Sequence, residues 1–543
     1  MTVRFFLALV GLWSGVPLPC YANLHAPSPP SLLESFPVQN QGRKKPFLVF
    51  ANEFLLSVSG AHSLTVGHTS LTATQIVVAL WLSPERWEGI PLLLVRDKPL
   101  KRTCKLTEDR DIFSFETLRG NRILQLQIEK AWAARARDPG AKLPAMLKAA
   151  DEVAARMSLL VGLTSGSLVR VLPNSSGDSA SWSALAPLDP RFKYLRSTYI
   201  SGNAASFEAA VSALKTSLME EAPSCYTAGM FKIRLELLYQ TIRPFRLAWI
   251  LYLFGGVTLL LSSHSHFGVP SYLCAQILTA TGLLCQLVGF ICRILIAGRP
   301  PVTNMYESVV WFAFGTVFFA LLLEQIYHAH FFLAGAIPVA TGALFLADRQ
   351  PLFLTHSIQP LTAVLQSNFW LTTHVLIITL SYAAFAIAMG MGHIALWKVL
   401  LHQSTPHPLC GHIYRVLQVG IFLLAVGIFL GGIWANYSWG RFWDWDPKET
   451  WALVTLLAYL VLLHGRVARQ WEGLGLAIGA IVCFLSVLMA WYGVNFLLGT
   501  GLHSYGFGVG GRAYVASAIG LDALFVISAV VRGRCWTASP SHC

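Results

Sequence analysis

Residues 437–451 of this chain are YSWGRFWDWDPKETW. The stretch holds four tryptophans, one phenylalanine, two aspartates and three further charged residues. One apolar run precedes it, from Val416 to Trp434, and another follows it, from Trp451 to Leu463. Each run is about the length that a helix needs to cross a hydrocarbon core. The stretch is therefore predicted to be a short aromatic segment at one boundary between lipid and water, with a membrane helix on each side.

Two interpretations of this segment are open. Tryptophans gather at membrane boundaries as simple anchors. An anchor needs one or two indoles, however, whereas this segment interleaves four with carboxylates. A flat apolar surface ringed by charges suits a large planar ligand that has an apolar face and ionic edges. We therefore favour a ligand platform over a pure interface anchor.

The composition is that of a polytopic membrane protein. Of the 543 residues, 55% are hydrophobic and only 12% are charged, which is too apolar for a soluble globular protein. The formal net charge of +13 is not gathered in a long basic run. We interpret it as loop and surface charge, and we expect no nucleic-acid partner.

The first 22 residues are predicted to be a secretory signal peptide. Arg4 precedes an apolar run from Phe5 to Val16, and the segment ends on the small residue Ala22. Export of this end would place the chain from Asn23 onward outside the cytoplasmic membrane. No CxxC motif occurs among the ten cysteines, although Cys104 and Cys225 of the exported part could pair.

Residues 23–243 are predicted to form one extracytoplasmic α+β domain. Strand-like patterns cover Thr74–Trp81 and Ile90–Val95. Helical spacing of apolar residues covers Ile123–Ala133 and Leu143–Leu160. The region is long enough to bury a core, but it shows no catalytic constellation, so a docking or spacer role is the better interpretation.

Residues 244–543 are predicted to form a transmembrane domain with nine spans. Alternation from an outside N-terminal domain places the aromatic segment in an external loop, 436–449. Arg293 and Arg299 then fall near the outer face, against the tendency of basic residues to lie inside. Either these two are functional charges or the count is wrong there. The predicted spans are 246–262, 271–297, 305–327, 331–347, 369–401, 413–435, 450–467, 473–498 and 515–532.

Three histidines are candidate ligands, because ionisable groups in spans are functional hypotheses by default. His374 begins the fifth span and His503 follows the eighth, so both should lie on the same face as the aromatic segment. A lone histidine at a helix end more simply makes a hydrogen bond. Two imidazoles around a planar platform are what axial ligation of a haem iron requires. His464, near the inner end of the seventh span, would belong to a second, inner site.

Several segments resemble the CcsA (ResC) family of cytochrome c biogenesis proteins, which is defined by a tryptophan-rich WWD domain. The resemblance covers about residues 290–510, and a weaker likeness to the exported part of fused family members covers 48–60 and 82–102. The segments that carry it are WGRFWDWDPKETWAL (439–453), LLHGR (462–466), WYGVNFLLGTGLHSYGFG (491–508), RPPVTNMYESVVWF (299–312) and WLTTHVLIITLSYAAFAIAMGMGHIAL (370–396).

The resemblance implies a set of sites. His374 and His503 would be the two external ligands of haem b, and His464 one of two intramembrane ligands. The surface of Trp439, Trp443 and Trp445 would pack on the porphyrin. Arg441, Lys448 or another outward basic group would pair with the haem propionates. The resemblance implies that the catalytic residues are Trp439, Trp443, Trp445 and Asp446. Asp446, with Asp444 and Glu449, would fix the loop by hydrogen bonds and not act as an acid or base.

The resemblance also implies a function. The protein would carry haem across the cytoplasmic membrane to its periplasmic side and promote thioether attachment to the Cys-x-x-Cys-His segment of apocytochrome c, as part of a holocytochrome c synthase. No clear four-span ResB portion precedes the exported domain, so a separate ResB/Ccs1-like membrane protein would supply the other inner ligand. Two alternatives remain: a haem exporter without ligase activity, and a membrane protein that handles quinone or lipid.

Overall fold

The computed structural model divides the chain into two compact units, Met1–Leu237 and Leu238–Cys543. The predicted signal peptide and His503 lie outside the residues that the structure describes. Those residues are 31–537, except 67–68, 88, 139–142, 174–181, 228, 263–267, 351–353, 360–367, 404–406 and 499–510.

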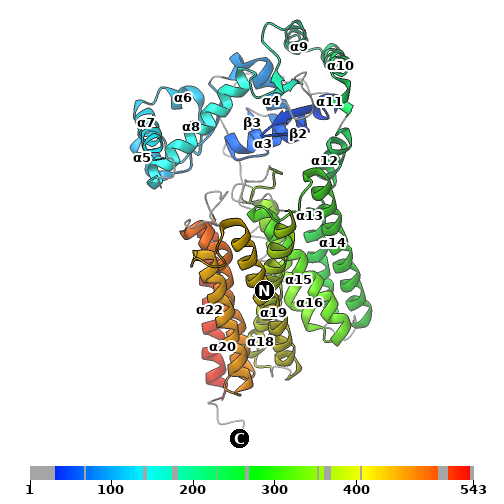
Figure 1. Ribbon diagram of the computed structural model, residues 1–543, viewed down its shortest axis with the longest axis vertical. Helices are drawn as coiled ribbons and strands as arrows, with labels where there is room; N and C mark the ends of the chain where they lie inside the picture. The colour runs from blue at the N-terminus through cyan, green and yellow to red at the C-terminus, as the bar shows by residue number, and fades with distance from the viewer. Residues whose placement is uncertain are drawn as a thin grey trace. The chain divides into compact units, whose positions relative to one another are not determined.

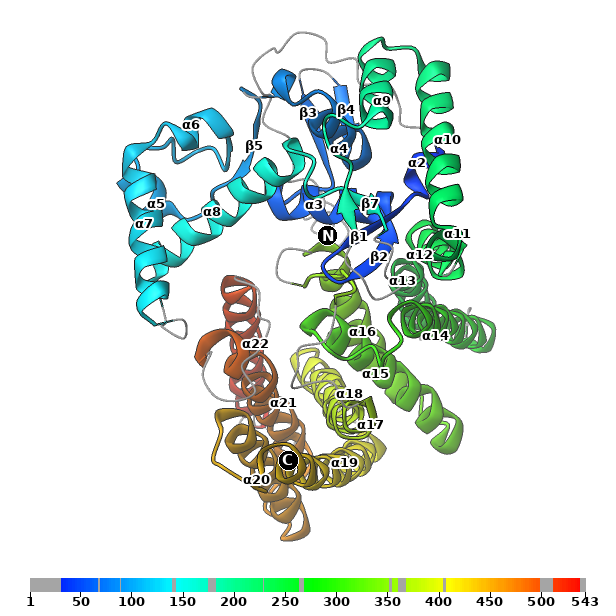
Figure 2. The ribbon, with the colours of Figure 1, turned by 45° about the horizontal axis from the view of Figure 1, so that its top comes forward.

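The first unit contains three small antiparallel sheets. The largest has the strand order β2-β1-β7-β8, and its strands β1, β2 and β7 are labelled in Figure 2. Strand β1 pairs with β2 so that Val38 lies opposite Lys45. The other two are the pairs β3–β4 and β5–β6. The strands are β1 Pro37–Asn40, β2 Arg43–Pro46, β3 Ser63–Val66, β4 Thr69–Thr72, β5 Pro91–Leu94, β6 Ile112–Ser114, β7 Arg170–Leu172 and β8 Ser183–Ala184.

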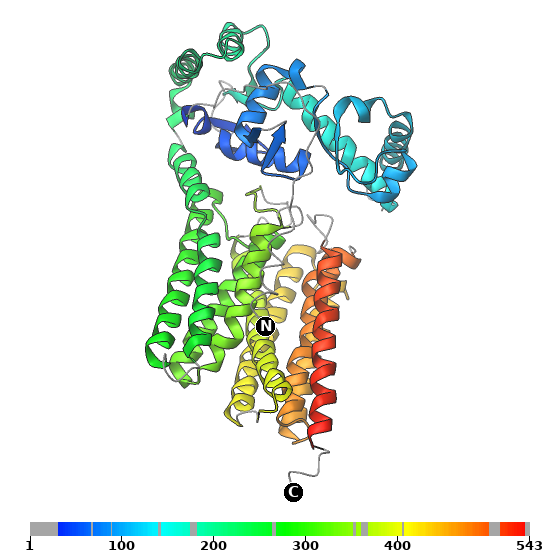
Figure 3. The ribbon, with the colours of Figure 1, turned by 180° about the vertical axis from the view of Figure 1, so that it is seen from behind.

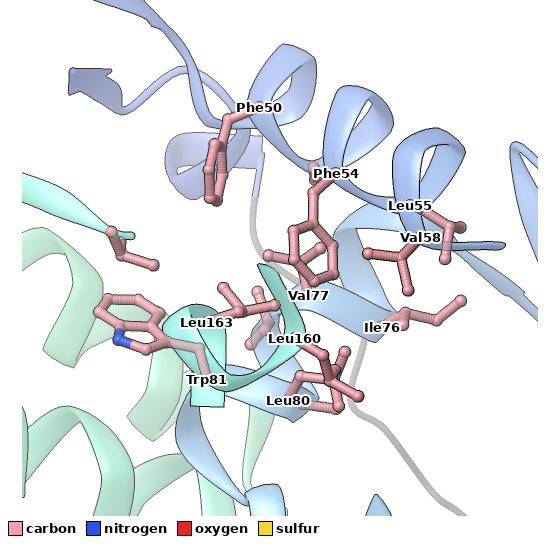
Figure 4. Packing of buried hydrophobic residues seen from close by; sticks show 14 of the residues in the cluster. Phe50, Phe54, Leu55, Val58, Ile76, Val77, Leu80, Trp81, Leu160 and Leu163 are labelled. Atoms are coloured by element: carbon pink, nitrogen blue, oxygen red, sulfur yellow. The ribbon is translucent and has the colours of Figure 1, made fainter. Parts of the chain in front are cut away.

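Helices supply most of the first unit's core. Phe50 and Phe54 of α3 face Val77 and Trp81 of α4 and Leu163 of α8, and all five are buried (Figure 4). The helices are α2 Ser31–Glu34, α3 Phe47–Ser59, α4 Ala73–Leu82, the 3₁₀ turn η1 Pro84–Trp87, α5 Lys98–Thr103, α6 Phe115–Arg119, α7 Arg122–Arg137, α8 Ala145–Thr164, α9 Pro190–Ile200, α10 Ala204–Glu221 and α11 Pro223–Thr227. Helix α12, Met230–Ile242, begins in the first unit and extends past the division at Leu237.

The strand predicted over Thr74–Trp81 is wrong, because these residues form α4. Nine of the ten residues of α4 are buried, so the helix has no polar face that would show a period of 3.6 in the sequence. The helix begins with a capping box: the Thr72 side chain accepts from the Gln75 backbone, and the Gln75 side chain accepts from the Thr72 backbone. This capping signal was present in the sequence, and it outweighs the preference of the β-branched residues of this segment for a strand.

The other local predictions in this unit are confirmed. The predicted strand Ile90–Val95 contains β5, and the two predicted helices correspond to α7 and α8. Cys104 and Cys225 are both buried free thiols and do not pair.

The second unit is an array of long apolar helices that lie side by side (Figures 1 and 3). Within the part of the chain that is described, nine helical stretches are long and apolar enough to cross a membrane, as predicted. The helices are α13 Pro244–Ser262, α14 Gly268–Ala297, α15 Met305–Tyr327, α16 Phe331–Arg349, α17 Asn368–Trp370, the π-helical η3 Leu371–Val375, α18 Leu376–Leu400, α19 His407–Trp439, α20 Pro447–Val467, α21 Leu474–Leu488, the π-helical η4 Met489–Leu498 and α22 Arg512–Thr537.

Helix α18 is the centre of this unit. It packs against α15, α16, α19, α21 and α22, and residues 381–388 are all buried. In the most apolar 18-residue stretch of this span, 67% of the residues are buried, whereas the corresponding share for α22 is 6%. A side chain at either end of α18 is therefore held by several neighbours at once.

Arg293 and Arg299, the two basic residues predicted near the outer face, belong to a buried ionic cluster. Arg293 of α14 donates to Glu307 of α15 at 2.6 Å, and Arg299 donates to the same carboxylate at 3.2 Å. Glu307 also accepts from the backbone N–H and the hydroxyl of Thr303. Since burying a charge is costly unless it is paired, this cluster explains how both arginines are accommodated while the nine-span count stands.

Candidate functional site

A cavity of about 180 Å³ lies among α15, η3, α18, α19, α20 and η4. Its lining is mainly aromatic and aliphatic, with a few polar groups, which is typical of ligand sites. Two of its walls are π-helical, η3 and η4. Such turns are rare and occur frequently at functional sites, because they change the direction in which side chains point. The cavity lies at the end of α20 where this helix begins, and we call this end of the second unit the cavity end.

His374 lies in the π turn η3 and lines the cavity. Its Nδ1 is 2.8 Å from the carbonyl oxygen of Gly427 in α19. A carbonyl oxygen only accepts, so Nδ1 carries the proton and Nε2 carries the lone pair of the ring. This is the arrangement in which histidines bind metals. A neighbouring helix therefore fixes both the tautomer and the orientation of this imidazole.

The His374 ring fits because residue 431 is a glycine. A Cβ placed on Gly431 would lie 2.5 Å from Cε1 of His374. On the adjacent turn of α19, Trp434 meets the same imidazole edge-on, with ring centroids 5.8 Å apart. The imidazole is thus held between a glycine and an indole of one helix.

Two of the three tryptophans of the predicted platform line the cavity. Trp439 ends α19, and Trp443 lies in the loop that follows. The indole nitrogen of Trp443 is buried and has no hydrogen-bond partner among the described residues. A buried N–H without a partner is costly, so this indole is a group that a bound ligand would satisfy.

Trp445 has a different environment. Its side chain is 69% exposed and is not part of the cavity lining. It packs edge-on against Trp443, with ring centroids 5.8 Å apart. Its φ of +57° is in the left-handed region, which a bulky residue rarely adopts. The loop therefore holds Trp445 outward at a cost in backbone strain.

The loop itself is shorter than the predicted 436–449. Helix α19 continues to Trp439 and ends where Gly440 takes a φ of +72°, a conformation that glycine adopts easily. Between the two helices, Arg441 forms an ion pair with Asp444. Arg441 is not among the cavity-lining residues.

Asp446 is the N-cap of α20. It forms a capping box with Glu449, and Pro447 occupies the first helical position. The Glu449 carboxylate accepts from the backbone N–H groups of Asp444, at 2.9 Å, and Asp446, at 3.3 Å. These two carboxylates therefore fix the loop against the start of α20.

Lys448 brings a positive charge into the cavity wall. Its ammonium donates to Oδ1 of Asn495 in η4 at 3.3 Å. Asn495 in turn donates to the Trp491 carbonyl at 2.8 Å, and the Trp491 indole donates to Ser308 of α15 at 3.1 Å. Hydrogen bonds thus connect α20, η4 and α15 around the cavity.

His464 lies in the last turn of α20, and its exposed imidazole donates from Nδ1 to the Leu460 carbonyl of its own helix at 2.8 Å. Pro447 begins this helix 17 residues earlier (464 − 447), which corresponds to roughly 26 Å along the axis. His464 is therefore remote from the cavity, and a second site at this end of α20 stays a prediction.

Sequence reasoning did not single out Trp434, Trp491 or Asn495. Both Trp491 and Asn495 are in the segment WYGVNFLLGTGLHSYGFG, which carried part of the family resemblance, so this signal was present. Trp434 had no such signal, because it ends an ordinary apolar run.

Comparison with known proteins identifies the family. The family model described as cytochrome C assembly protein matches residues 302–503. The cytochrome c biogenesis protein CcsA of Synechococcus sp. (strain CC9605) is 34% identical over 304 residues, which cover 48% of this chain and 98% of that protein. The chain belongs to the CcsA family of cytochrome c biogenesis proteins. Within this family, CcsA of Guillardia theta is 36% identical over 239 residues, covering 39% of this chain and 78% of that protein.

A longer relative extends the likeness beyond the CcsA-like part. Protein NrfI of Wolinella succinogenes is 29% identical over 504 residues, which cover 86% of this chain. The chain spans about half, 53%, of the length of NrfI. Among solved structures, a chain of the cytochrome c haem lyase CcmF matches with a TM-score of 0.39 and 14% identity, over 54% of this chain and 50% of that one.

Proposed function

We propose that this CcsA-family protein binds haem b in the cavity, delivers it across the cytoplasmic membrane and promotes its attachment to apocytochrome c. The observation that carries the proposal is His374: its proton is on Nδ1, a neighbouring helix holds its ring, and it lines an aromatic cavity. His503 would be the second residue to hold the haem iron. Family membership supports the proposal, because cytochrome c assembly requires haem handling.

The residues of the cavity fit a porphyrin. His374 supplies an iron ligand, and Trp439 and Trp443 supply flat apolar surface. Trp445 would extend this surface at its outer edge, and Arg441 would remain a basic group on the rim. Pockets that enclose a drug-sized ligand measure about 300–1,000 Å³, more than this cavity. We therefore infer that the cavity holds part of the macrocycle and leaves the rest accessible to a protein substrate.

Accessibility matters for the proposed reaction. A Cys-x-x-Cys-His segment of apocytochrome c would present two thiols to the two vinyl groups of haem. Each S–H would add across a C=C bond, which becomes a single bond as one C–S and one C–H bond form. The addition needs no external oxidant or reductant. The protein would contribute by positioning the reactants, with the loop held by Asp446 and Glu449.

The remaining assignments concern topology and partners. We propose that the first unit and the cavity end face the periplasm. His464, at the opposite end of α20, would bind haem on its way from the cytoplasmic side. A ResB/Ccs1-like membrane protein would supply the other ligand there.

Haem spectroscopy of histidine variants tests the site. His374→Gly and His503→Gly should remove the cavity-bound haem from the purified protein, and added imidazole should restore a ligated spectrum. His328→Gly is a matched control, because exposed His328 ends α15 at a φ of +48°, which glycine adopts readily. Unchanged haem spectra in both of these variants would show that the proposed ligands are wrong.

A reconstituted reaction separates the proposal from its alternatives. The purified protein, with its partner, is given haem and an apocytochrome, and covalent haem is measured after denaturation. Haem that remains extractable would favour an exporter without ligase activity. A colourless protein whose activity concerns quinone or lipid would replace the proposal altogether.

A further inference from the structure

We propose that Lys448 is the carboxylate-binding residue of the cavity and that it makes the site selective for porphyrins with free propionates. This inference rests on the proposed function and names the part of the ligand that the cavity recognises. The carboxylates of the ligand, rather than its ring or its iron, would be the partner of this ammonium.

The first observation is the incomplete pairing of Lys448. An ammonium group has three donor hydrogens. Among the residues that the structure describes, its hydrogen-bond partner is the neutral Oδ1 of Asn495 at 3.3 Å, and it forms no ion pair within 4.0 Å. A cation in the wall of an apolar cavity needs a counter-ion to offset the loss of hydration.

The second observation is the position of Lys448 on its helix. It lies in the first turn of α20, directly after Pro447. The N-terminal turn of a helix carries a partial positive charge, so anions are favoured there and cations are disfavoured. A lysine at this position adds to a field that is already positive. An anion in the cavity would be attracted by both the ammonium and the helix.

The carboxylates closest in sequence are already engaged. Asp446 accepts from the backbone of Lys448, and Glu449 accepts from the backbone of Asp444 and Asp446. Both fix the start of α20, and neither carboxylate is within ion-pair distance of the Lys448 ammonium, although Glu449 also lines the cavity and Asp446 is close enough to attract the ammonium. The missing anion would therefore come from outside the chain.

The third observation is that three arginines near the cavity end are paired with carboxylates, whereas Arg512 at the start of α22 donates to the Phe496 carbonyl. Arg441 pairs with Asp444, while Arg293 and Arg299 share Glu307. Among the described residues that line the cavity, Lys448 is the only lysine or arginine. This difference in pairing assigns the ligand's carboxylate to Lys448 and not to the rim arginine.

Two probes test the selectivity: haem, and haem whose propionates are blocked as the dimethyl ester. Each is titrated into purified full-length protein in detergent, and binding is followed by the His374-dependent absorption. A charge-assisted hydrogen bond contributes about 1.5–3 kcal/mol, so the native protein should prefer haem by about tenfold or more.

Charge variants should remove or invert this preference. Lys448→Met should bind both probes within about twofold of each other, and Lys448→Glu should prefer the ester. Glutamate suits the first turn of a helix, so the second variant should fold even if the first does not. Binding of the ester reports directly on folding. Lys398→Met, a lysine in the last turn of α18, is the matched control and should keep the native preference.

Arg441, the other basic residue that could bind a propionate, provides the decisive comparison. Arg441→Gln should keep the preference for haem. If Arg441→Gln loses the preference while Lys448→Met and Lys448→Glu keep it, the inference is overturned in favour of the rim arginine. If the native protein shows no His374-dependent absorption with either probe, the proposed function fails and this inference fails with it. If native protein binds both probes equally, the haem site stands and only the role of Lys448 is refuted.

Discussion

His374 and His464 use the same hydrogen bond in two different settings. In each, Nδ1 donates to a backbone carbonyl oxygen at 2.8 Å. The carbonyl that holds His374 belongs to another helix, and the ring lines a cavity beside Trp434. The carbonyl that holds His464 is four residues earlier in its own helix, and the ring is exposed. The same side chain is part of a built site at one end of the second unit and a surface group at the other.

This contrast shows what a site requires beyond a ligand residue. At the cavity end, π turns, a glycine, a capping box and a buried ionic cluster all restrict the position of groups around His374. Among the described residues, the hydrogen bond that holds the His464 ring comes from its own helix. A partner chain that packs against this end of α20 would add contacts to the His464 ring. The proposed ResB/Ccs1-like protein would be such a partner. Substitutions at the two ends should therefore have different effects.

Removing Glu307 should have the largest effect. Glu307→Gln leaves Arg293 and Arg299 buried without their shared carboxylate, and breaking a buried ion pair in this way costs about 3–5 kcal/mol. The matched control is Glu472→Gln at the opposite end, where an exposed pair with Arg466 contributes at most about 1 kcal/mol. Thermal unfolding in detergent measures both. Equal losses would show that the cavity end is no more tightly held.

Gly431→Ala should have the next largest effect. The new methyl group would collide with the His374 ring, so haem affinity at the cavity should fall about 10–100-fold, the range seen when groups that orient a metal ligand are changed. Gly411→Ala lies in the same helix with open space around it and should leave affinity unchanged. Spectral titration with haem compares the two. Native affinity in the Gly431 variant would mean that the ring position is not set by α19.

The two neighbouring tryptophans should differ by a smaller amount. Trp443→Leu removes a cavity-lining indole and should weaken haem binding by about 1 kcal/mol, or roughly fivefold. Trp445→Leu removes an exposed indole and should change affinity by less than about twofold. The reverse ranking would place the porphyrin outside the cavity, against the exposed face of the loop.

His464→Gly should have the smallest effect at the cavity. The variant should purify with less haem, because the proposed entry site is lost. Haem added to the purified variant should nevertheless bind at the cavity with native affinity, since His464 is roughly 26 Å from the start of α20. A reduced affinity at the cavity would contradict the separation of the two sites.

Much of the architecture could be predicted from the sequence. Nine spans follow from the length and apolarity of their runs, because a membrane helix satisfies its own backbone and needs no partner to be recognised. The first unit was harder. Residues 74–81 were predicted to be a strand, because a helix that is buried on every side lacks the periodicity that identifies it. The capping residues Thr72 and Gln75 nevertheless indicated the start of a helix.

The sequence by itself determined that the chain crosses the membrane repeatedly and which family it resembles, and it predicted that His374 and the tryptophans of the loop share one site. Only the tertiary structure decided that Trp443 faces the cavity while Trp445 faces away, and that Arg441 has an internal partner while Lys448 lies in the cavity wall. The reason is physical. Membrane crossing depends on composition along one helix, whereas the direction and pairing of a side chain depend on neighbours that are distant in the sequence.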